Sequence, residues 1–211
     1  TSFMVRLLII ILALAISSYV MGQTNKTSII IPTLSSTGEI SNIKKSCSYN
    51  SDLANEKTII SLPAEREMSI VKKILSYTGL PLNFQIFSAN INNAAALIIG
   101  EDRVILYDPS LLKTVDLTSK TYWTSISILA HEIGHHLSGH TLSANSNFLQ
   151  KELEADKFSG FVLYKMGASI DQSMAAITLF GDNLDTRTHP NKIRRMEAIK
   201  NGWNEAAGYR Y

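Results

Sequence analysis

Two histidines, His131 and His135, stand four residues apart, and Glu132 directly follows the first. Residues four apart on an α-helix share a face, so both imidazoles can be presented to one metal ion. Glu132 projects about 100° around the helix from His131, which leaves it outside the pair but close enough to reach a metal-bound water. The spacing therefore predicts a zinc-binding helix on which Glu132 is the catalytic base. On the same helix Ile126, Leu129, Ile133 and Leu137 form the expected core face.

A catalytic zinc ion takes three protein ligands and keeps one position for water, so a third ligand must come from elsewhere in the chain. Metzincins would place glycine and histidine where this sequence has Ser138 and Thr141, which disfavours that class. Glu152 and Asp156 are again four apart, whereas Glu154 points away from their face. We predict Glu152 as the third ligand of a single Zn²⁺ ion, and Asp156 as the acceptor that orients a ligand histidine.

The other histidines and the single cysteine have weaker claims to chemistry. His136 lies near the core face and is expected to be packed, and His140 is expected to interact with the carbonyls at the helix end. His189 precedes Pro190 and so has an extended backbone; on a loop over the cleft it could donate a hydrogen bond to an oxyanion. Cys47 has no disulfide partner and is expected to be a surface thiol, with a role as a zinc plug as the alternative.

Length and composition favour one domain with a packed core, because the 211 residues are 45% hydrophobic and 18% charged. A net charge of +2 is too small to indicate a nucleic-acid partner. Residues 1–23 resemble a signal peptide or an N-terminal anchor, so we expect export to the periplasm or medium, with membrane attachment only through this segment if it is uncleaved. Residues 24–55 predict a poorly ordered linker, and residues 56–211 the folded domain.

A small antiparallel sheet is expected just before the zinc helix. Residues 64–78 predict an amphipathic helix, and residues 83–87, 94–99 and 103–107 predict three short strands. An edge strand next to a metal helix can pair with an extended peptide through main-chain hydrogen bonds.

The segments around and after the zinc helix complete a predicted α+β fold. Residues 108–112 predict a turn and residues 113–120 a polar connector. Helices are then expected over 145–166, 170–180 and 191–200.

These residues resemble the zinc metallopeptidase family of the CAAX prenyl endopeptidase and HtpX type, within the gluzincin group. The resemblance covers about residues 64 to 200 and rests on four motifs: His131–His135; Glu152–Asp156; Thr188–Pro190 followed by Arg195; and, more weakly, Asn93, Ala94, Ala95 and Ala96 with Arg103–Tyr107. It implies a zincin-like domain in which His131, His135 and Glu152 bind zinc and Glu132 is the base. It also implies that His189 lies near the substrate oxyanion, that Arg195 braces the His189 loop, and that Asn93–Ala96 form the substrate edge strand.

The predicted function is that of an exported, zinc-dependent metalloendopeptidase that hydrolyses peptide bonds in an extended protein or peptide substrate. Without a second apolar run long enough to cross a membrane, the chain is similar to a soluble, exported branch of the family. The main alternative is a zinc-stabilised binding or chaperone-like module whose metal site is closed by His189 or Cys47. An exopeptidase is disfavoured, because no further acidic motif beside the edge strand would hold a free amino terminus.

Overall fold

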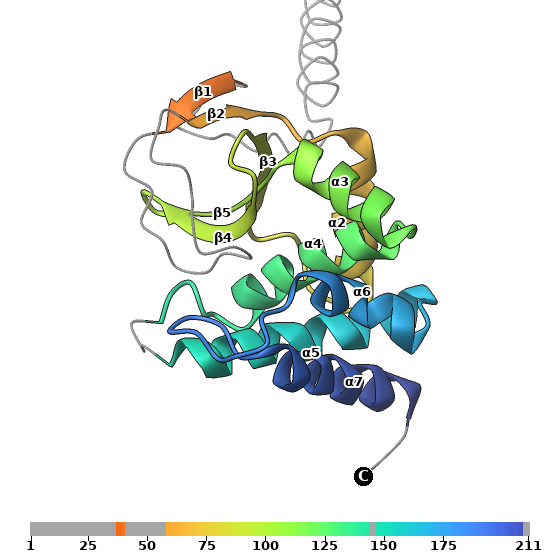
Figure 1. The fold of residues 1–211 in the computed structure, drawn as a ribbon. Helices are drawn as coiled ribbons and strands as arrows, with labels where there is room; N and C mark the ends of the chain where they lie inside the picture. The colour runs from red at the N-terminus through yellow and green to blue at the C-terminus, as the bar shows by residue number, and fades with distance from the viewer. Residues whose placement is uncertain (1–36, 41–57, 144–146, 209–211) are drawn as a thin grey trace, which may run out of the picture. The chain divides into compact units, whose positions relative to one another are not determined.

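The structure is a computed structural model that describes residues 37–40, 58–143 and 147–208. All of these belong to one of the two compact units of the chain, Leu34–Tyr211. Figure 1 shows helix α4 between the sheet and helix α5, so this unit is α+β, as predicted. The elements in chain order are β1 (Thr37–Ile40), β2 (Thr58–Ser61), α2 (Glu65–Ser76), β3 (Gln85–Ala89), β4 (Ala94–Ile99), β5 (Asp102–Tyr107), α3 (Pro109–Ser119), α4 (Trp123–Leu137), α5 (Phe148–Met166), α6 (Ile170–Phe180) and α7 (Lys192–Ala207).

The five strands that the structure describes form a mixed sheet in the order β1-β2-β3-β5-β4. β3 and β5 are parallel, with Gln85 opposite Val104, whereas the other neighbouring pairs are antiparallel. The prediction of an antiparallel sheet is therefore wrong at one pair. The chain reverses between β4 and β5, and β5 lies between β3 and β4 in the sheet. β3 therefore pairs with a strand that runs in the same direction.

β1 lies within residues 24–55, the segment predicted to be a poorly ordered linker. Thr37 pairs with Ser61 of β2, and Ile40 pairs with Thr58. Strands of four residues are too short to show a clear alternation in the sequence, which is why neither was predicted. The rest of that segment, Cys47 and the predicted leader at 1–23 lie outside the described residues. No helix in the described part of the chain has the length and apolar character needed to cross a membrane.

The segment after β5 is helix α3, which corrects the predicted turn and polar connector. Asp108 caps the helix, because its Oδ1 accepts a hydrogen bond from the Ser110 N–H at 2.8 Å. Pro109 occupies the first helical position, where no N–H is needed. Only Leu112 and Val115 of this helix are buried, and two buried apolar residues give too weak a periodicity for prediction.

The remaining helices match the predicted ranges closely, except at the end of α7. α6 has the predicted bounds, and α5 begins at Phe148, three residues after the predicted start. α7 begins after Asn191, whose side chain accepts a hydrogen bond from the Arg194 N–H. It runs to Ala207, beyond the predicted end at Lys200.

Helix α4 is buried on all of its sides, whereas the sequence predicts one core face and one metal face. Every residue from Trp123 to His136 is buried, because β4 and β5 pack against α4 as do α2, α3, α5 and α6. Ile128, Leu129 and Ile133 have no exposed surface. The histidines on this helix are therefore held away from water by the core of the unit.

Two glycines allow α5 and α7 to approach each other closely. A Cβ atom at Gly160 of α5 would overlap the carbonyl oxygen of Ile199 in α7. In the same way, a Cβ atom at Gly202 of α7 would overlap the carbonyl oxygen of Lys157. Because α5 and α7 both carry candidate site residues, this contact fixes the position of those residues relative to one another.

Replacing Gly160 with alanine is expected to destabilise the protein. The added methyl group meets backbone that no rotamer change can move, and overpacking of this kind costs about 1–3 kcal/mol. We expect this cost to exceed the roughly 1 kcal/mol that alanine gains over glycine in a helix, so the midpoint of urea unfolding should fall. Lys157→Ala is the control, because it removes only the exposed ion pair with Glu205. An unchanged midpoint for Gly160→Ala would show that α5 and α7 are not in close contact.

Candidate metal centre

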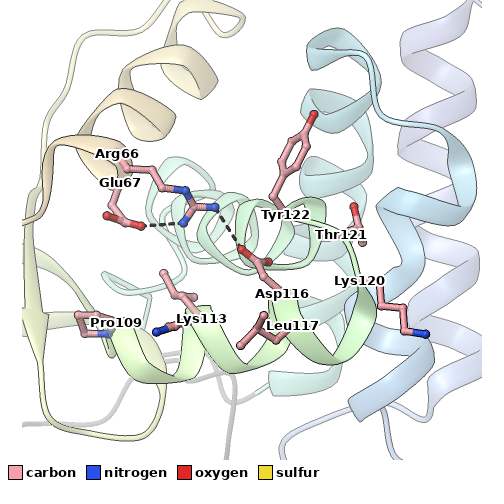
Figure 2. A pocket seen from close by; sticks show the side chains of 10 residues that line it. Arg66, Glu67, Pro109, Lys113, Asp116, Leu117, Lys120, Thr121 and Tyr122 are labelled. Carbon is pink, nitrogen blue, oxygen red and sulfur yellow. Dashed lines mark hydrogen bonds and ion pairs between the residues drawn. The ribbon is translucent and has the colours of Figure 1, made fainter.

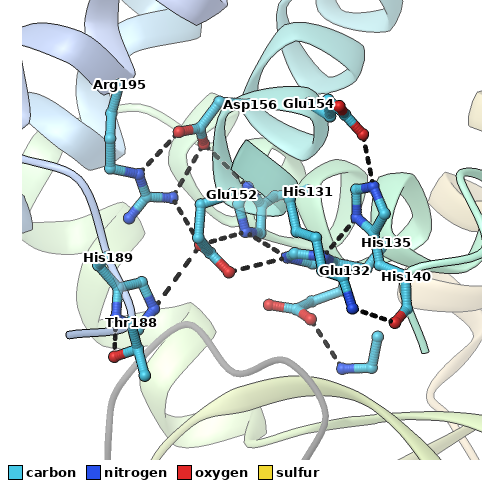
Figure 3. A network of polar contacts seen from close by, with 12 residues as sticks. His131, Glu132, His135, His140, Glu152, Glu154, Asp156, Thr188, His189 and Arg195 are labelled. Carbon is cyan, nitrogen blue, oxygen red and sulfur yellow. Dashed lines mark hydrogen bonds and ion pairs between the residues drawn. The ribbon is translucent and has the colours of Figure 1, made fainter. Parts of the chain in front are cut away.

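Helices α4 and α5 bring His131, His135 and Glu152 together in one buried group that could hold a metal ion. The Nε2 atoms of the two histidines are 3.0 Å apart. The Glu152 carboxylate lies across them, with Oε2 at 3.3 Å from His131 Nε2 and Oε1 at 3.3 Å from His135 Nε2. Figure 3 shows the two rings and this carboxylate converging on one point. The three predicted ligands are therefore placed together, as the helix spacing requires.

Gly134 allows α4 and α5, the two helices that carry the candidate ligands, to approach at this point. A Cβ atom there would lie 3.1 Å from the Ala155 Cα and 3.1 Å from a ring carbon of Phe158, which is tighter than ordinary contact. Ala155 itself has no exposed surface. Gly134 and Ala155 are thus small enough to let α5 lie against α4 with Glu152 facing the two histidines.

Asp156 makes the predicted contact with one of the two candidate ligand histidines. Its Oδ1 lies 2.9 Å from His131 Nδ1. Arg195 holds this carboxylate from the other side, donating from Nε to Oδ2 at 2.7 Å and from Nη2 to Oδ1 at 2.9 Å. Burial raises the pKa of Asp156, but the charges of Arg195 and His131 outweigh this effect and keep the pKa below its usual value.

Arg195 also approaches the third predicted ligand. Its Nη2 lies 3.7 Å from Glu152 Oε2, and its side chain is only 5% exposed. The resemblance implies that Arg195 braces the loop around His189. The contacts described here are instead with two carboxylates of α5, because one guanidinium reaches both Glu152 and Asp156.

In the absence of a metal ion the two predicted histidine ligands have very different pKa values. Burial lowers the pKa of His131, but the charges and hydrogen bonds of Asp156 and Glu152 overcome this and raise it to about 10. Burial lowers the pKa of His135 to about 4, although the hydrogen bond with Glu152 opposes the shift. Burial also disfavours the charged form of Glu152, but the two histidine rings that face its carboxylate hold its pKa well below the usual range. A cation that binds here would meet an ionised Glu152 carboxylate and a neutral His135 ring, and it would displace the proton that His131 carries.

Glu132 lies between α4 and the sheet and has no exposed surface. Its Oε2 accepts a hydrogen bond from the Ala96 N–H at 2.7 Å, and its buried Oε1 makes no hydrogen bond with any described residue. Burial raises the pKa of Glu132 to about 8, although the charge of His131 opposes the shift. A buried carboxyl group in this position, beside the candidate metal ligands, could exchange a proton with a group bound there.

The predicted substrate edge strand lies beside Glu132. β4 ends the strand order of the described sheet, and the backbone N–H of its Ala96 donates a hydrogen bond to Glu132. Asn93, Ala94, Ala95 and Ala96 have no exposed surface. The Asn93 side chain accepts a hydrogen bond from the Ala94 N–H, and its carbonyl accepts one from the Asp108 N–H. This strand is therefore firmly held next to the predicted base.

His189 is also brought to the group, on the side of Glu152. Its Nε2 lies 3.6 Å from Glu152 Oε2, and its side chain is 13% exposed. The ring is oriented by Thr188, whose Oγ1 lies 3.0 Å from His189 Nδ1. The Thr186 side chain and backbone also bond to the backbone of His189. The loop before α7 thus places an imidazole next to the predicted third ligand.

His140 and Glu154 also belong to this cluster, although they were not predicted from the sequence to be part of it. His140 Nδ1 lies 3.0 Å from His135 Nδ1, and His140 Nε2 lies 2.8 Å from Glu154 Oε2. Gly139 is the feature of the sequence that could have indicated the position of His140. It has a positive φ of 71° and turns the chain back at the end of α4. His136, by contrast, is packed as predicted, stacked on Phe84.

A pocket of about 660 Å³ lies elsewhere, where α2, α3 and the start of α4 meet (Figure 2). Arg66 lines it and donates to Glu67 at 2.8 Å and to Asp116 at 3.1 Å, so its charge is already paired. None of the predicted site residues lines this pocket. The pocket is therefore separate from the candidate metal centre of α4 and α5.

Comparisons of the chain with protein-family models, with curated proteins and with solved structures found no match. The resemblance to the gluzincin family therefore stays a prediction that rests on the residues themselves.

Proposed function

We propose that the protein is a zinc-dependent metalloendopeptidase with a zincin-like domain, of the gluzincin type. The observation that carries this proposal is the close approach of the His131, His135 and Glu152 side chains beside a buried glutamate, Glu132. Zinc binds imidazole nitrogen at about 2.0–2.1 Å and carboxylate oxygen at about 2.0–2.2 Å in a tetrahedron, so adjacent ligand atoms should lie roughly 3.3–3.5 Å apart. Each ring lies 3.3 Å from one of the two Glu152 carboxylate oxygens, which matches this spacing, and the two Nε2 atoms at 3.0 Å need to separate by only a few tenths of an ångström to bind one ion.

The donor set also favours zinc over harder cations. Calcium and magnesium prefer six or more oxygen ligands, whereas two imidazoles and one carboxylate are a known catalytic zinc set. The buried Glu152 Oε2 makes no hydrogen bond with any described residue, although two histidines and Arg195 surround it. An acceptor held in this way is more readily explained by a cation than by packing.

In this proposal each polar residue of the cluster has a defined task. A zinc ion would supply Lewis acidity, polarising a carbonyl and lowering the pKa of a water molecule to about 7. Glu132 accepts a proton from the attacking water and passes it to the leaving amine. His189 donates a hydrogen bond to the oxygen that gains negative charge. Asp156 holds His131 with its Nε2 toward the metal position, and Arg195 holds Asp156.

The proposed substrate is an extended segment of protein or peptide. β4 ends the described sheet next to Glu132. Its partly exposed end, Ile98 and Ile99, is where a peptide would begin to pair, using main-chain groups with little regard for side chains. Recognition of this kind suits cleavage within a chain rather than at its end. The predicted leader further suggests that the enzyme acts after export.

A second candidate function is a zinc-stabilised, non-catalytic binding module. The observation that favours it is the 3.6 Å distance between His189 Nε2 and Glu152 Oε2, which places a third imidazole where it could close the fourth position. Such a protein would bind zinc but would not cleave peptides.

The test is digestion of an unstructured peptide library by the purified full chain, with and without a chelator. We expect internal cleavage that is lost on chelation and restored by adding zinc, because zinc supplies the Lewis acid of the reaction. Zinc binding without cleavage would favour the closed module. Cleavage that persists after the metal has been removed would contradict the proposal.

A further inference from the structure

His140 lies behind His135, on the side of its ring away from Glu152 (Figure 3). The two Nδ1 atoms are 3.0 Å apart, and the two rings are inclined at 68°. The other nitrogen of His140 faces Glu154 Oε2 at 2.8 Å. A continuous chain of polar contacts therefore runs from the metal-facing edge of His135 through His140 to a carboxylate on α5.

The direction of the hydrogen bonds in this chain follows from the groups at its ends. An ionised carboxylate such as Glu154 can only accept, so His140 Nε2 carries the hydrogen. In a neutral imidazole the other nitrogen is then an acceptor, so His140 Nδ1 accepts a hydrogen bond from His135 Nδ1. His135 Nε2 consequently keeps its lone pair, and this is the nitrogen that faces His131 and Glu152.

We propose that His140 and Glu154 are positioning residues for His135. Through this chain they select the tautomer in which His135 Nε2 can bind a metal ion, and they fix the orientation of the ring. The inference rests on the proposed function only in taking the group of His131, His135 and Glu152 as a metal site.

The surroundings of the pair hold it in place. The buried Lys151 donates from Nζ to the carbonyl oxygens of His140 and Ser143, each at 3.0 Å. Gln150 donates to Glu154 Oε1 at 3.0 Å, which leaves Oε2 for His140. The His140 N–H also bonds to the His135 carbonyl at 3.0 Å. The hydrogen bonds from Lys151 restrain the backbone at His140 and Ser143, and this restraint helps to keep the His140 ring in one position.

The two ligand histidines are therefore supported in different ways. His131 contacts a carboxylate directly, in Asp156, whereas His135 reaches one through a second ring. The Glu154 side chain is 47% exposed, so it can be shortened without leaving a cavity in the core. This exposure makes Glu154 the residue at which the proposal can be tested with little risk to folding.

The test measures the zinc affinity of the full chain by competition with a chromophoric chelator. Glu154→Ala is expected to weaken zinc binding about tenfold, the lower end of the effect of removing an outer hydrogen-bond partner of a ligand. Glu154→Gln should stay close to the unmodified protein, because its amide oxygen still accepts from His140. Glu205→Ala is the matched control, since it also removes one exposed, paired carboxylate, and it should leave the affinity unchanged.

A second readout reports the tautomer itself. Nitrogen-15 NMR of the zinc-loaded protein should show His140 protonated at Nε2 and unprotonated at Nδ1, in the unmodified protein and in Glu154→Gln. Equal zinc affinity for Glu154→Ala and Glu205→Ala, or a hydrogen on His140 Nδ1, would overturn this inference and leave the proposed function standing. A failure of the unmodified protein to bind zinc would overturn both.

Discussion

Replacing Glu132 with glutamine is expected to abolish peptide hydrolysis while leaving the metal in place. Glutamine has nearly the same shape and can still accept the hydrogen bond that the Ala96 N–H donates to Oε2 at 2.7 Å. It cannot take a proton from water. Because general acid–base groups contribute about 10²–10⁴-fold to rates, kcat should fall at least about 100-fold, measured on the peptide that the unmodified enzyme cleaves best.

Metal content and a matched variant control this experiment. Glu101→Gln, in the exposed turn between β4 and β5, removes one negative charge far along the chain from the cluster and should hydrolyse peptides normally. Normal hydrolysis by Glu132→Gln would show that another group is the base. Loss of the metal from Glu132→Gln would show instead that this carboxylate is a ligand.

Replacing Glu152 with alanine is expected to have the largest effect on metal binding. It removes one of three ligand atoms and the only carboxylate of the predicted ligand set. The loss of zinc affinity should exceed the roughly 10–100-fold effect of removing an outer partner, so zinc should be lost on dialysis against a weak chelator. Metal analysis of the dialysed protein measures this directly.

Glu154→Ala, two residues further along the same helix, is the control for this variant. It removes the same charge from α5 but no ligand atom, so its affinity should fall between those of the unmodified protein and Glu152→Ala. Equal zinc retention by Glu152→Ala and the unmodified protein would mean that Glu152 does not bind the metal. Circular dichroism of each variant shows whether the helices are intact.

The inner part of the candidate site could be predicted because helix geometry converts a spacing of four residues into one shared face. That rule places His131 with His135 on α4, and Glu152 with Asp156 on α5. It cannot say how two helices dock. Here the docking depends on close contact between Gly134 and Ala155, which no periodicity reveals.

The outer part of the site was missed because it lies where regular periodicity ends. His140 follows a residue of positive φ, Gly139, and so returns to His135 by a turn rather than along the helix. Glu154 does point away from Glu152, as predicted, but in that direction it meets His140. A helical wheel describes one helix and does not extend to a turn that folds back against a second helix.

The same limit explains the errors in the fold. The turn signal at residues 100–102, between the short runs 94–99 and 103–107, predicts a hairpin, and β4 and β5 form it. β3 pairs with β5, in parallel, because β4 lies on the other side of β5. Strand order of this kind is set by packing rather than by the local sequence pattern. α3 was missed because its stability depends on the Asp108 cap and on burial of Leu112 and Val115 rather than on a strong stripe.

The most direct test of the metal centre is anomalous diffraction at the zinc edge from crystals of the zinc-loaded protein. We predict one anomalous peak at about 2.0–2.2 Å from His131 Nε2, His135 Nε2 and a Glu152 carboxylate oxygen. No peak there, or a peak whose ligands do not include all three residues, would contradict the proposed metal centre.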